Sequence, residues 1–221
     1  MIGKGTKKMN NYKDEKQPEG NYYNKYESKN IVERLLMKCF FGNIEKCLRK
    51  SDIQPLSILE AGCGEGHFTN FLRNVYTTSE IDAFDVSEKV VKQAKSTLDN
   101  INFKVGSIYS IDASEGQYDL VVASEVLEHL ETPEKAFGEL MRVSSAFVLI
   151  TVPHEPIWRI LNMCRGKYLR RLGNTPGHIQ HWSRGAIKKY IRSLSTKNVK
   201  RVTIRTSLPW LIIIIEKTNK S

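Results

Sequence analysis

Two hydrophobic periods alternate along the middle of the chain, and together they predict alternating strands and helices. Short apolar runs predict strands over residues 56–62, 80–87, 101–106, 118–126 and 146–153. Apolar side chains three or four positions apart predict amphipathic helices over residues 66–76, 88–98 and 132–144. Strands that alternate with helices in this way indicate an α/β fold with a doubly wound, mostly parallel sheet.

The two ends of the chain depart from this order. Residues 31–49 predict a helix that is interrupted near Gly42, with an inner face formed by Ile31, Leu35, Leu36, Cys39 and Phe40. Strand-like runs over 197–206 and 208–217 are separated by too few residues for a parallel crossover. They predict an antiparallel hairpin, which completes a sheet of seven strands with an antiparallel last strand.

A long connection separates the strand that ends near Val152 from a helix that begins near Ser183. It is too long for a bare loop and predicts a helical lid over 153–182, at the carboxyl end of a strand, where open α/β sheets bind their ligands. We therefore expect a disordered polar tail over 1–20 and one domain over 21–221, which begins with a helical cap over 21–50.

Charge is distributed unevenly along the 221 residues, whose net charge is +10. Residues 156–215 contain 13 Lys and Arg and no Asp or Glu. This basic third indicates an anionic acceptor or partner, nucleic acid included, or else a solvated basic face.

Neither a membrane span nor a secretory signal is expected. No apolar run approaches the ~18 residues that cross a bilayer, and the first residues lack an apolar core. The four cysteines form no C-x-x-C pair, so we expect reduced thiols and a cytoplasmic protein.

The first buried strand runs directly into a glycine-rich turn, where backbone can approach a ligand closely. The absence of a Lys after Gly66 excludes a P-loop, and the third glycine comes one residue too early for the dinucleotide fingerprint. What remains is E-x-G-x-G-x-G from Glu60 to Gly66. Asp85, at the end of the next strand, is placed to accept both hydroxyl hydrogens of a ribose, or else to cap the following helix.

These two elements, together with the stretch ASEVLEHL that closes the fourth strand, resemble the class I S-adenosylmethionine-dependent methyltransferases. The resemblance covers residues 55–153 and extends to the final hairpin. It implies S-adenosylmethionine as the cofactor and a binding site formed by Glu60, Gly62, Cys63, Gly64, Asp85, Val86, Ser107, Ile108, Ser124 and Glu125. Many relatives carry Asp where this chain has Ser107, so the contact of that residue with the adenine departs from the family pattern.

Methyl transfer from a sulfonium needs mainly an aligned nucleophile, and a hydroxyl nucleophile is helped by a base near neutral pKa. His154 begins the lid, where the transferred methyl is expected to point, and it is our candidate base. The alternative is that His154 only forms hydrogen bonds within the lid. His178 and His181 are placed to contact substrate or to pin the lid.

The spacing E-x-x-E-H, formed by Glu125, Glu128 and His129, presents carboxylates and an imidazole on one turn. The same stretch resembles the ubiquinone-pathway O-methyltransferases and the small-RNA 3′-end 2′-O-methyltransferases, and the latter add a further His, for which His178 or His181 would serve. Metal-free relatives also carry such pairs, so we assign no metal. In that interpretation His129 packs beside the cofactor and Glu128 is solvated.

Together these features predict a methyltransferase acting on oxygen of a small or lipid-linked anionic acceptor. The lid contains one acidic residue, Glu155, and several cations that suit a phosphate or a carboxylate. These cations are Arg159, Arg165, Lys167, Arg170 and Arg171. Tyr23 or Tyr26 is expected to fold over the cofactor. The alternatives are an RNA methyltransferase, with or without a metal, and a non-catalytic basic binding module.

Overall fold

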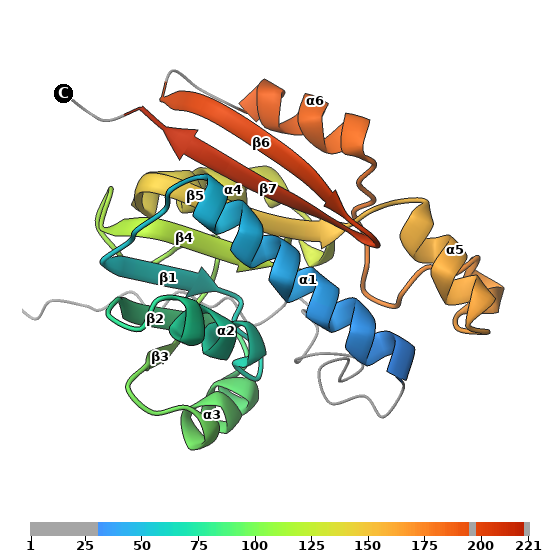
Figure 1. The fold of residues 1–221 in the computed structure, drawn as a ribbon, viewed down its shortest axis with the longest axis horizontal. Coiled ribbons are helices and arrows are strands. Elements are labelled where there is room, and N and C mark those ends of the chain that lie inside the picture. Colours follow the sequence, from blue (N-terminus) through green and yellow to red (C-terminus); the bar gives the residue numbers. More distant parts are fainter. Residues whose placement is uncertain (1–30, 195–197, 219–221) are drawn as a thin grey trace, which may run out of the picture.

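The computed structural model describes residues 31–194 and 198–218. Seven strands form one sheet in the order β3-β2-β1-β4-β5-β7-β6 (Figure 1). Their bounds are Ser57–Ala61 (β1), Glu80–Asp85 (β2), Asn102–Val105 (β3), Tyr118–Ser124 (β4), Ser144–Pro153 (β5), Val199–Ser207 (β6) and Trp210–Lys217 (β7). The predictions for the tail over 1–20 and for Tyr23 and Tyr26 lie outside the described residues.

Strand pairing confirms the predicted fold. The strands β1 to β5 pair in parallel, whereas β7 is antiparallel to both β5 and β6. From β1 the chain adds β2 and β3 toward one edge of the sheet. It then returns to the centre, where β4 pairs with β1, and adds the later strands toward the other edge. The strand order therefore reverses between β1 and β4. Such a switch point leaves a crevice at the carboxyl ends of the strands.

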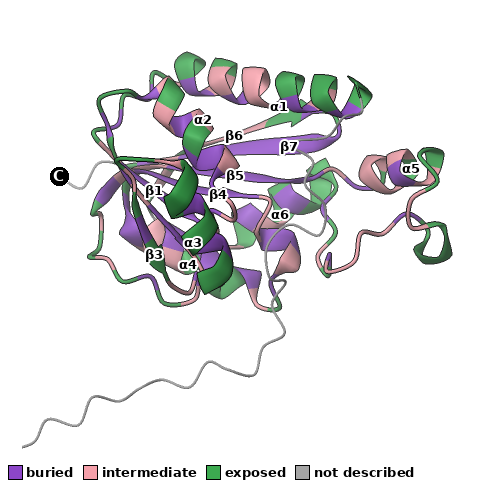
Figure 2. Ribbon diagram, turned by 90° about the horizontal axis from the view of Figure 1, so that it is seen from below, coloured by how far each residue is buried: buried purple, intermediate pink, exposed green. Residues whose placement is uncertain are grey.

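Helices cover both faces of the sheet (Figures 1 and 2). Apolar side chains of α1, α2 and α3 pack on one face, and those of α4 and α6 pack on the other. The helices span Ile31–Lys50 (α1), His67–Val75 (α2), Glu88–Thr97 (α3), Pro133–Val143 (α4), Ile157–Cys164 (α5) and Arg184–Leu194 (α6). Burial on both faces explains why β4, β5 and β7 read as nearly continuous apolar runs.

The first helix differs from the expectation in two ways. It continues without a break through Gly42, where an added Cβ would meet no atom within 4 Å. Its buried side chains are Glu33, Met37, Phe40, Ile44 and Leu48, whereas Leu35, expected on the inner face, is 61% exposed. The face was misjudged because apolar residues occur all round the first two turns, and the spacing of 37, 40, 44 and 48 becomes clear only over the whole helix.

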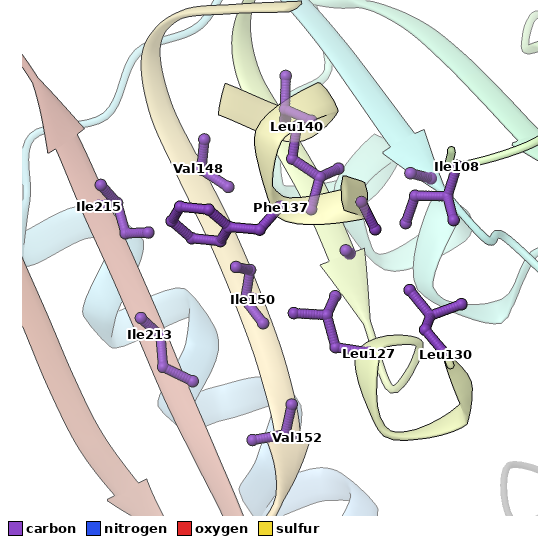
Figure 3. Close-up of a cluster of buried hydrophobic side chains, with 14 of the residues drawn as sticks. Ile108, Leu127, Leu130, Phe137, Leu140, Val148, Ile150, Val152, Ile213 and Ile215 are labelled. Carbon is purple, nitrogen blue, oxygen red and sulfur yellow. The ribbon is translucent and has the colours of Figure 1, made fainter. Parts of the chain in front are cut away.

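The core on the α4 face also anchors the segment that follows β4. Phe137 and Leu140 of α4 pack toward Val148 of β5 (Figure 3). The short 3-10 helix η1, Leu127–His129, inserts Leu127 into the same cluster, and Leu130 joins it there. With these two leucines buried, Glu128 and His129 are held in a defined position between them.

The segment that was predicted as a lid follows the carboxyl end of β5, and the name lid is kept for it. It consists of α5, a second 3-10 helix η2 over Leu169–Arg171, and the loop that leads to α6. Figure 2 shows α5 projecting beyond the end of the sheet. The Asn162 amide donates to the Gly173 carbonyl over 2.8 Å, and the Trp158 indole donates to the Thr175 hydroxyl over 3.0 Å. These bonds tie α5 to the returning loop.

No helix in the described part of the chain is long and apolar enough to cross a membrane. Cys39, Cys47, Cys63 and Cys164, which are all described, are free thiols.

Truncation of one α1 side chain tests the buried face of this helix. Ile44 is fully buried against the sheet, so Ile44→Ala is expected to lower the free energy of unfolding by about 2–5 kcal/mol. Leu35→Ala is the matched control on the exposed face, with an expected change of about 0.5 kcal/mol or less. Urea unfolding followed by circular dichroism measures both, and equal losses would contradict the assigned face.

Candidate active site

The glycine-rich turn after β1 adopts a backbone that excludes side chains. Gly62 and Gly66 have φ values of 79° and 86°, in the left-handed region that favours glycine. A Cβ at Gly62 would lie 2.6 Å from Cγ2 of Val126, a residue that follows β4. The turn therefore brings bare backbone against the end of β4.

Asp85 at the end of β2 holds this turn in place. One of its carboxylate oxygens accepts the Gly64 N–H over 3.0 Å, and the other accepts the Ser87 N–H over 2.9 Å. Next to it, the Phe84 carbonyl accepts the N–H groups of Gly62 and Cys63 over 2.8 and 3.0 Å. Burial raises the pKa of Asp85, and the backbone N–H bonds act in the opposite direction. The carboxylate therefore orders two loops and also borders the cavity between them.

A cavity of about 120 Å³ lies at the carboxyl ends of β1, β2 and β4. We call it the cofactor cavity. Its lining includes every residue expected at the cofactor site except Ser107, that is Glu60, Gly62, Cys63, Gly64, Asp85, Val86, Ile108, Ser124 and Glu125. Its other lining residues include His129, which the metal-free interpretation of the sequence placed beside the cofactor. Sequence reasoning did not assign the rest, which are His67, Phe68, Phe84, Gly106, Val126 and Leu130.

Ser107 lines a neighbouring cavity instead, on the other side of Gly106. Its hydroxyl accepts the Tyr109 N–H over 3.2 Å, in a local turn that also pairs Ser107 with Ser110. A serine hydroxyl readily bonds to backbone two residues ahead, and this local bond turns the side chain away from the expected contact.

Glu60 is a buried acid at the methionine end of the expected site. It is 1% exposed, and its Oε2 accepts the Thr69 hydroxyl over 2.5 Å. Burial raises the pKa of Glu60 to about 8, and the nearby Asp85 charge adds to this, whereas the Thr69 bond opposes it. The carboxyl group therefore carries a proton at neutral pH unless a positive charge binds beside it.

A second cavity, of about 220 Å³, lies between α1, α5 and the start of β7. We call it the lid cavity. Its apolar lining consists of Val32, Leu36, Met37, Trp158, Leu161, Pro209 and Trp210. Glu125 and His129 line both cavities. Glu125 has a φ of 58°, and its Oε2 accepts the Trp210 indole N–H over 2.8 Å, so this side chain is held where the two cavities meet.

Within the lid segment, Glu155 is the one acid that the sequence offers to the lid cations. The structure adds a second acid from outside the lid. Glu33 of α1, 5% exposed, pairs with Arg165 over 3.1 Å and with Lys167 over 3.2 Å. The partners are more than 130 positions apart, which is why a scan along the sequence missed them. Arg170 and Arg171 are exposed on η2.

The structure does not bring His154 to either cavity. Its backbone N–H donates to the Pro209 carbonyl over 2.9 Å and thereby continues the pairing of β5 with the start of β7. Strand alternation places its side chain on the face of Val152, next to Trp182, which it pairs with in an isolated bridge. Burial lowers the pKa of His154, and the charge of Arg184 on α6 adds to this. This is the α6 side of the sheet, whereas the lid cavity lies on the α1 side.

The E-x-x-E-H stretch is divided by the fold. Glu128, His129 and His178 offer ligand atoms that all lie within 4.8 Å of one another. Glu125 is not part of this cluster, and His181 lies 3.7 Å from Glu155 instead. Glu128 is 1% exposed, so the expectation that it is solvated is wrong. The reason is the loop that carries His178, which covers η1.

The donor set of the cofactor cavity fits S-adenosylmethionine. A buried acid, Glu60, lies at the start of the glycine-rich turn. A partly buried acid, Asp85, lies one strand over, and apolar side chains such as Ile108 and Leu130 lie beside them. A ligand with a cationic amino acid group, a vicinal diol and a flat base matches these groups.

Comparison with known proteins gives the same assignment. Residues 59–146 match the family described as methyltransferase domain. A malonyl-[acyl-carrier protein] O-methyltransferase from Anoxybacillus flavithermus is 28% identical over 121 residues, which are 52% of this chain and 46% of that protein. The chain spans less than half the length of the first curated relatives it matches, with shares of 21%, 46%, 38% and 45%.

Solved structures share the fold over nearly the whole chain. Magnesium protoporphyrin IX methyltransferase from Synechocystis, with bound S-adenosylhomocysteine, is 17% identical with a TM-score of 0.62 and covers 89% of this chain and 91% of its own. A plantazolicin methyltransferase complex is 14% identical with a TM-score of 0.68 and covers 86% of this chain and 87% of its own. Residues 59–146 therefore match a methyltransferase domain, and the solved methyltransferases share the fold of this chain.

Proposed function

We propose that this protein transfers the methyl group of S-adenosylmethionine to an oxygen of a small or lipid-linked anionic acceptor. The observation that carries the proposal is the meeting of two different cavities at Glu125 and His129. The cofactor cavity is bordered by the acids Glu60 and Asp85 and by bare backbone, and the lid cavity is largely apolar. A donor in the first and an acceptor in the second would place the reacting groups side by side.

In this proposal the cofactor cavity binds the donor through its two acids. Asp85 accepts the ribose hydroxyls, and Glu60 receives the amino group at the methionine end. Val86 and Ile108 contact the adenine, and the backbone of Gly62 and Gly64 lets the methionine part approach closely. Cys63, Ser124 and Glu125 complete the wall, and Ser107 has no direct contact.

Methyl transfer requires mainly that the protein align the acceptor atom with the sulfonium methyl group. The sulfonium methyl is already activated, and a carboxylate acceptor is already a nucleophile at neutral pH, so no base is required for it. A hydroxyl acceptor would need a base. His129 is the imidazole that lines both cavities in the described part of the chain, and it is better placed for that role than His154.

The lid cavity supports an acceptor with an apolar body. Met37, Trp158, Leu161 and Trp210 offer a surface that suits an acyl chain or a flat ring. The exposed Arg170 and Arg171 on η2 suit an anionic carrier or head group. The malonyl-carrier relatives are O-methyltransferases by name, and an acyl group on a carrier would satisfy both features. The free cysteines are consistent with a cytoplasmic enzyme.

RNA methylation is the second candidate, because residues 156–215 carry 13 basic and no acidic residues. In the structure these charges are spread over the lid, α6 and β6 rather than gathered at the cavities. Arg165 and Lys167 pair with Glu33, and Lys200 and Arg201 pair with Glu216. This distribution favours the small or lipid-linked acceptor.

Removing the carboxylate of Asp85 is expected to weaken cofactor binding severely. Asp85→Ala should lower the affinity for S-adenosylhomocysteine about 10- to 100-fold in calorimetry, since it deletes charged hydrogen bonds to ligand and turn. Glu88→Ala, which removes an exposed acid three positions on, is the control and should leave the affinity unchanged. Equal affinity of Asp85→Ala and the parent protein would remove Asp85 from the site.

Binding of S-adenosylmethionine is expected to release a proton from Glu60. The free carboxyl has a pKa of about 8, and a neighbouring cationic amino group lowers it, so the proton leaves on binding at pH 7. The release should shrink as the pH rises through about 8, because Glu60 is then already ionised in the free protein. Calorimetry in two buffers of different ionisation enthalpy measures it. Glu60→Gln should lose this release, and an equal release in both proteins would contradict the assignment.

Acceptor competition separates the two candidate activities. Purified protein with S-adenosylmethionine should form S-adenosylhomocysteine with a malonyl-loaded acyl carrier protein or a long-chain carboxylate, and not with a small-RNA duplex. Trp158→Ala should raise the acceptor KM while the affinity for S-adenosylhomocysteine stays within about twofold, because Trp158 lines only the lid cavity. Turnover with RNA alone would overturn the proposed acceptor class.

A further inference from the structure

We propose that Arg165, Lys167 and Tyr168 bind a second anionic group of the acceptor, a phosphate or a carboxylate, in the lid cavity. All three side chains line this cavity, and none of them lines the cofactor cavity. A guanidinium, an ammonium and a phenolic hydroxyl are donors that suit the oxygens of such an anion. The anion is distinct from the oxygen that receives the methyl group, which belongs where the lid cavity meets the cofactor cavity.

Two cations share a single carboxylate in this cavity. Nη1 of Arg165 and Nζ of Lys167 lie 3.1 and 3.2 Å from the same oxygen, Oε1 of Glu33. The two positive charges therefore lie next to each other, and the charge of Glu33 offsets only one of them. Glu33 lines the lid cavity as well, so the three side chains together present a net positive charge to a ligand there.

The lid itself orients Arg165. Nη2 of Arg165 donates to Oδ1 of Asn162 over 2.5 Å, and Asn162 is 1% exposed. The Asn162 amide donates in turn to the Gly173 carbonyl over 2.8 Å and to the Thr175 hydroxyl over 3.2 Å. A guanidinium offers several N–H donors in a fixed plane, and within the described residues Glu33 and Asn162 use only part of them. Arg165 is therefore positioned for a ligand before one binds.

The turn after α5 brings Lys167 and Tyr168 to the same cavity. The Lys167 N–H donates to the Asn162 carbonyl over 2.8 Å, so the turn folds back on the helix. Gly166 and Tyr168 have φ values of 68° and 56°, in the left-handed region. This conformation is uncommon for a bulky side chain such as that of Tyr168, and strained residues of this kind concentrate at ligand-binding positions.

Positive and negative side chains lie on different parts of the lid cavity. Glu125 follows β4 and lines the boundary with the cofactor cavity, and Glu128 lies on the same segment. Arg165 directly follows α5, which projects beyond the end of the sheet (Figure 2). Trp158 and Leu161 precede Arg165 on α5 and contribute to the apolar lining. The cavity therefore fits an acceptor with a methyl-accepting oxygen at one end, an apolar body, and an anion at the other end.

This arrangement narrows the class of acceptor. A molecule with one polar end would leave the cations of the lid cavity without a ligand, whereas an acyl group on a phosphate-bearing carrier or head group would contact both ends. That the bearer of the anion is the methyl acceptor rests on the proposed function. The binding of the anion by Arg165, Lys167 and Tyr168 does not.

Binding of octyl phosphate and octanoate, each compared with 1-octanol, tests the anion site without methyl transfer. The probes share one apolar chain and differ in the head group. In calorimetry, the parent protein should bind the preferred anionic probe at least ~10-fold more tightly than 1-octanol, because charged hydrogen bonds hold the head group. The anion that binds more tightly shows whether the site takes a phosphate or a carboxylate.

Two variants break the same ion pair with opposite effects on charge. Arg165→Gln removes a positive charge and should abolish the preference for the anionic probe, while its affinity for 1-octanol stays within about twofold. Glu33→Gln removes the negative charge and should bind the anionic probe at least as tightly as the parent protein does. Arg192→Gln, which removes an exposed cation of α6, is the control for net charge and should keep the parent preference.

Affinity for S-adenosylhomocysteine, measured on each variant, shows that it is folded and keeps its cofactor cavity. Equal weakening of anion binding in Arg165→Gln and Glu33→Gln would mean that the ion pair only ties α1 to the lid, and would overturn the anion site. Equal affinity of the parent protein for all three probes would also overturn it and leave the proposed methyl transfer intact. Loss of S-adenosylhomocysteine binding by the parent protein would instead count against the proposed function.

Discussion

The carboxylate of Asp85 is the constraint on which the site depends. It accepts one N–H from the glycine-rich turn after β1 and one from the start of α3, and so joins the ends of two neighbouring strands. Three of the five residues of this turn are glycines, so few side chains hold it and it needs a partner outside itself. A partly buried charge is costly unless hydrogen bonds satisfy it, and here the turn and the start of α3 each supply one. The same oxygens are then in position for a ligand.

The other half of the site depends on contacts between distant parts of the chain. Glu33 in α1 pairs with Arg165 and Lys167 of the lid, and Trp210 of β7 holds Glu125 at the end of β4. The residues that form these bonds line the lid cavity, which meets the cofactor cavity at Glu125. The parallel sheet therefore supplies the cofactor cavity, and its two additions, the N-terminal helix and the lid, supply the second.

The sequence was sufficient to predict the sheet, because strands buried on both faces leave long apolar runs such as those of β4 and β7. It also located the glycine-rich turn and Asp85, whose spacing reflects adjacent parallel strands. The sequence did not predict the position of a side chain where a single local interaction determines that position. Ser107 turns toward its own loop, and His154 falls on the α6 face because strand pairing extends one residue past Pro153. Glu33 and Trp210 gave no local signal, since their partners are remote in sequence.

A crystal structure of the protein grown with S-adenosylhomocysteine tests the central claim most directly. The account predicts the ribose hydroxyls on Asp85, the amino group beside Glu60 and the sulfur facing the lid cavity near Glu125 and His129. A ligand bound elsewhere, or density in the cofactor cavity whose ribose makes no contact with Asp85, would contradict it.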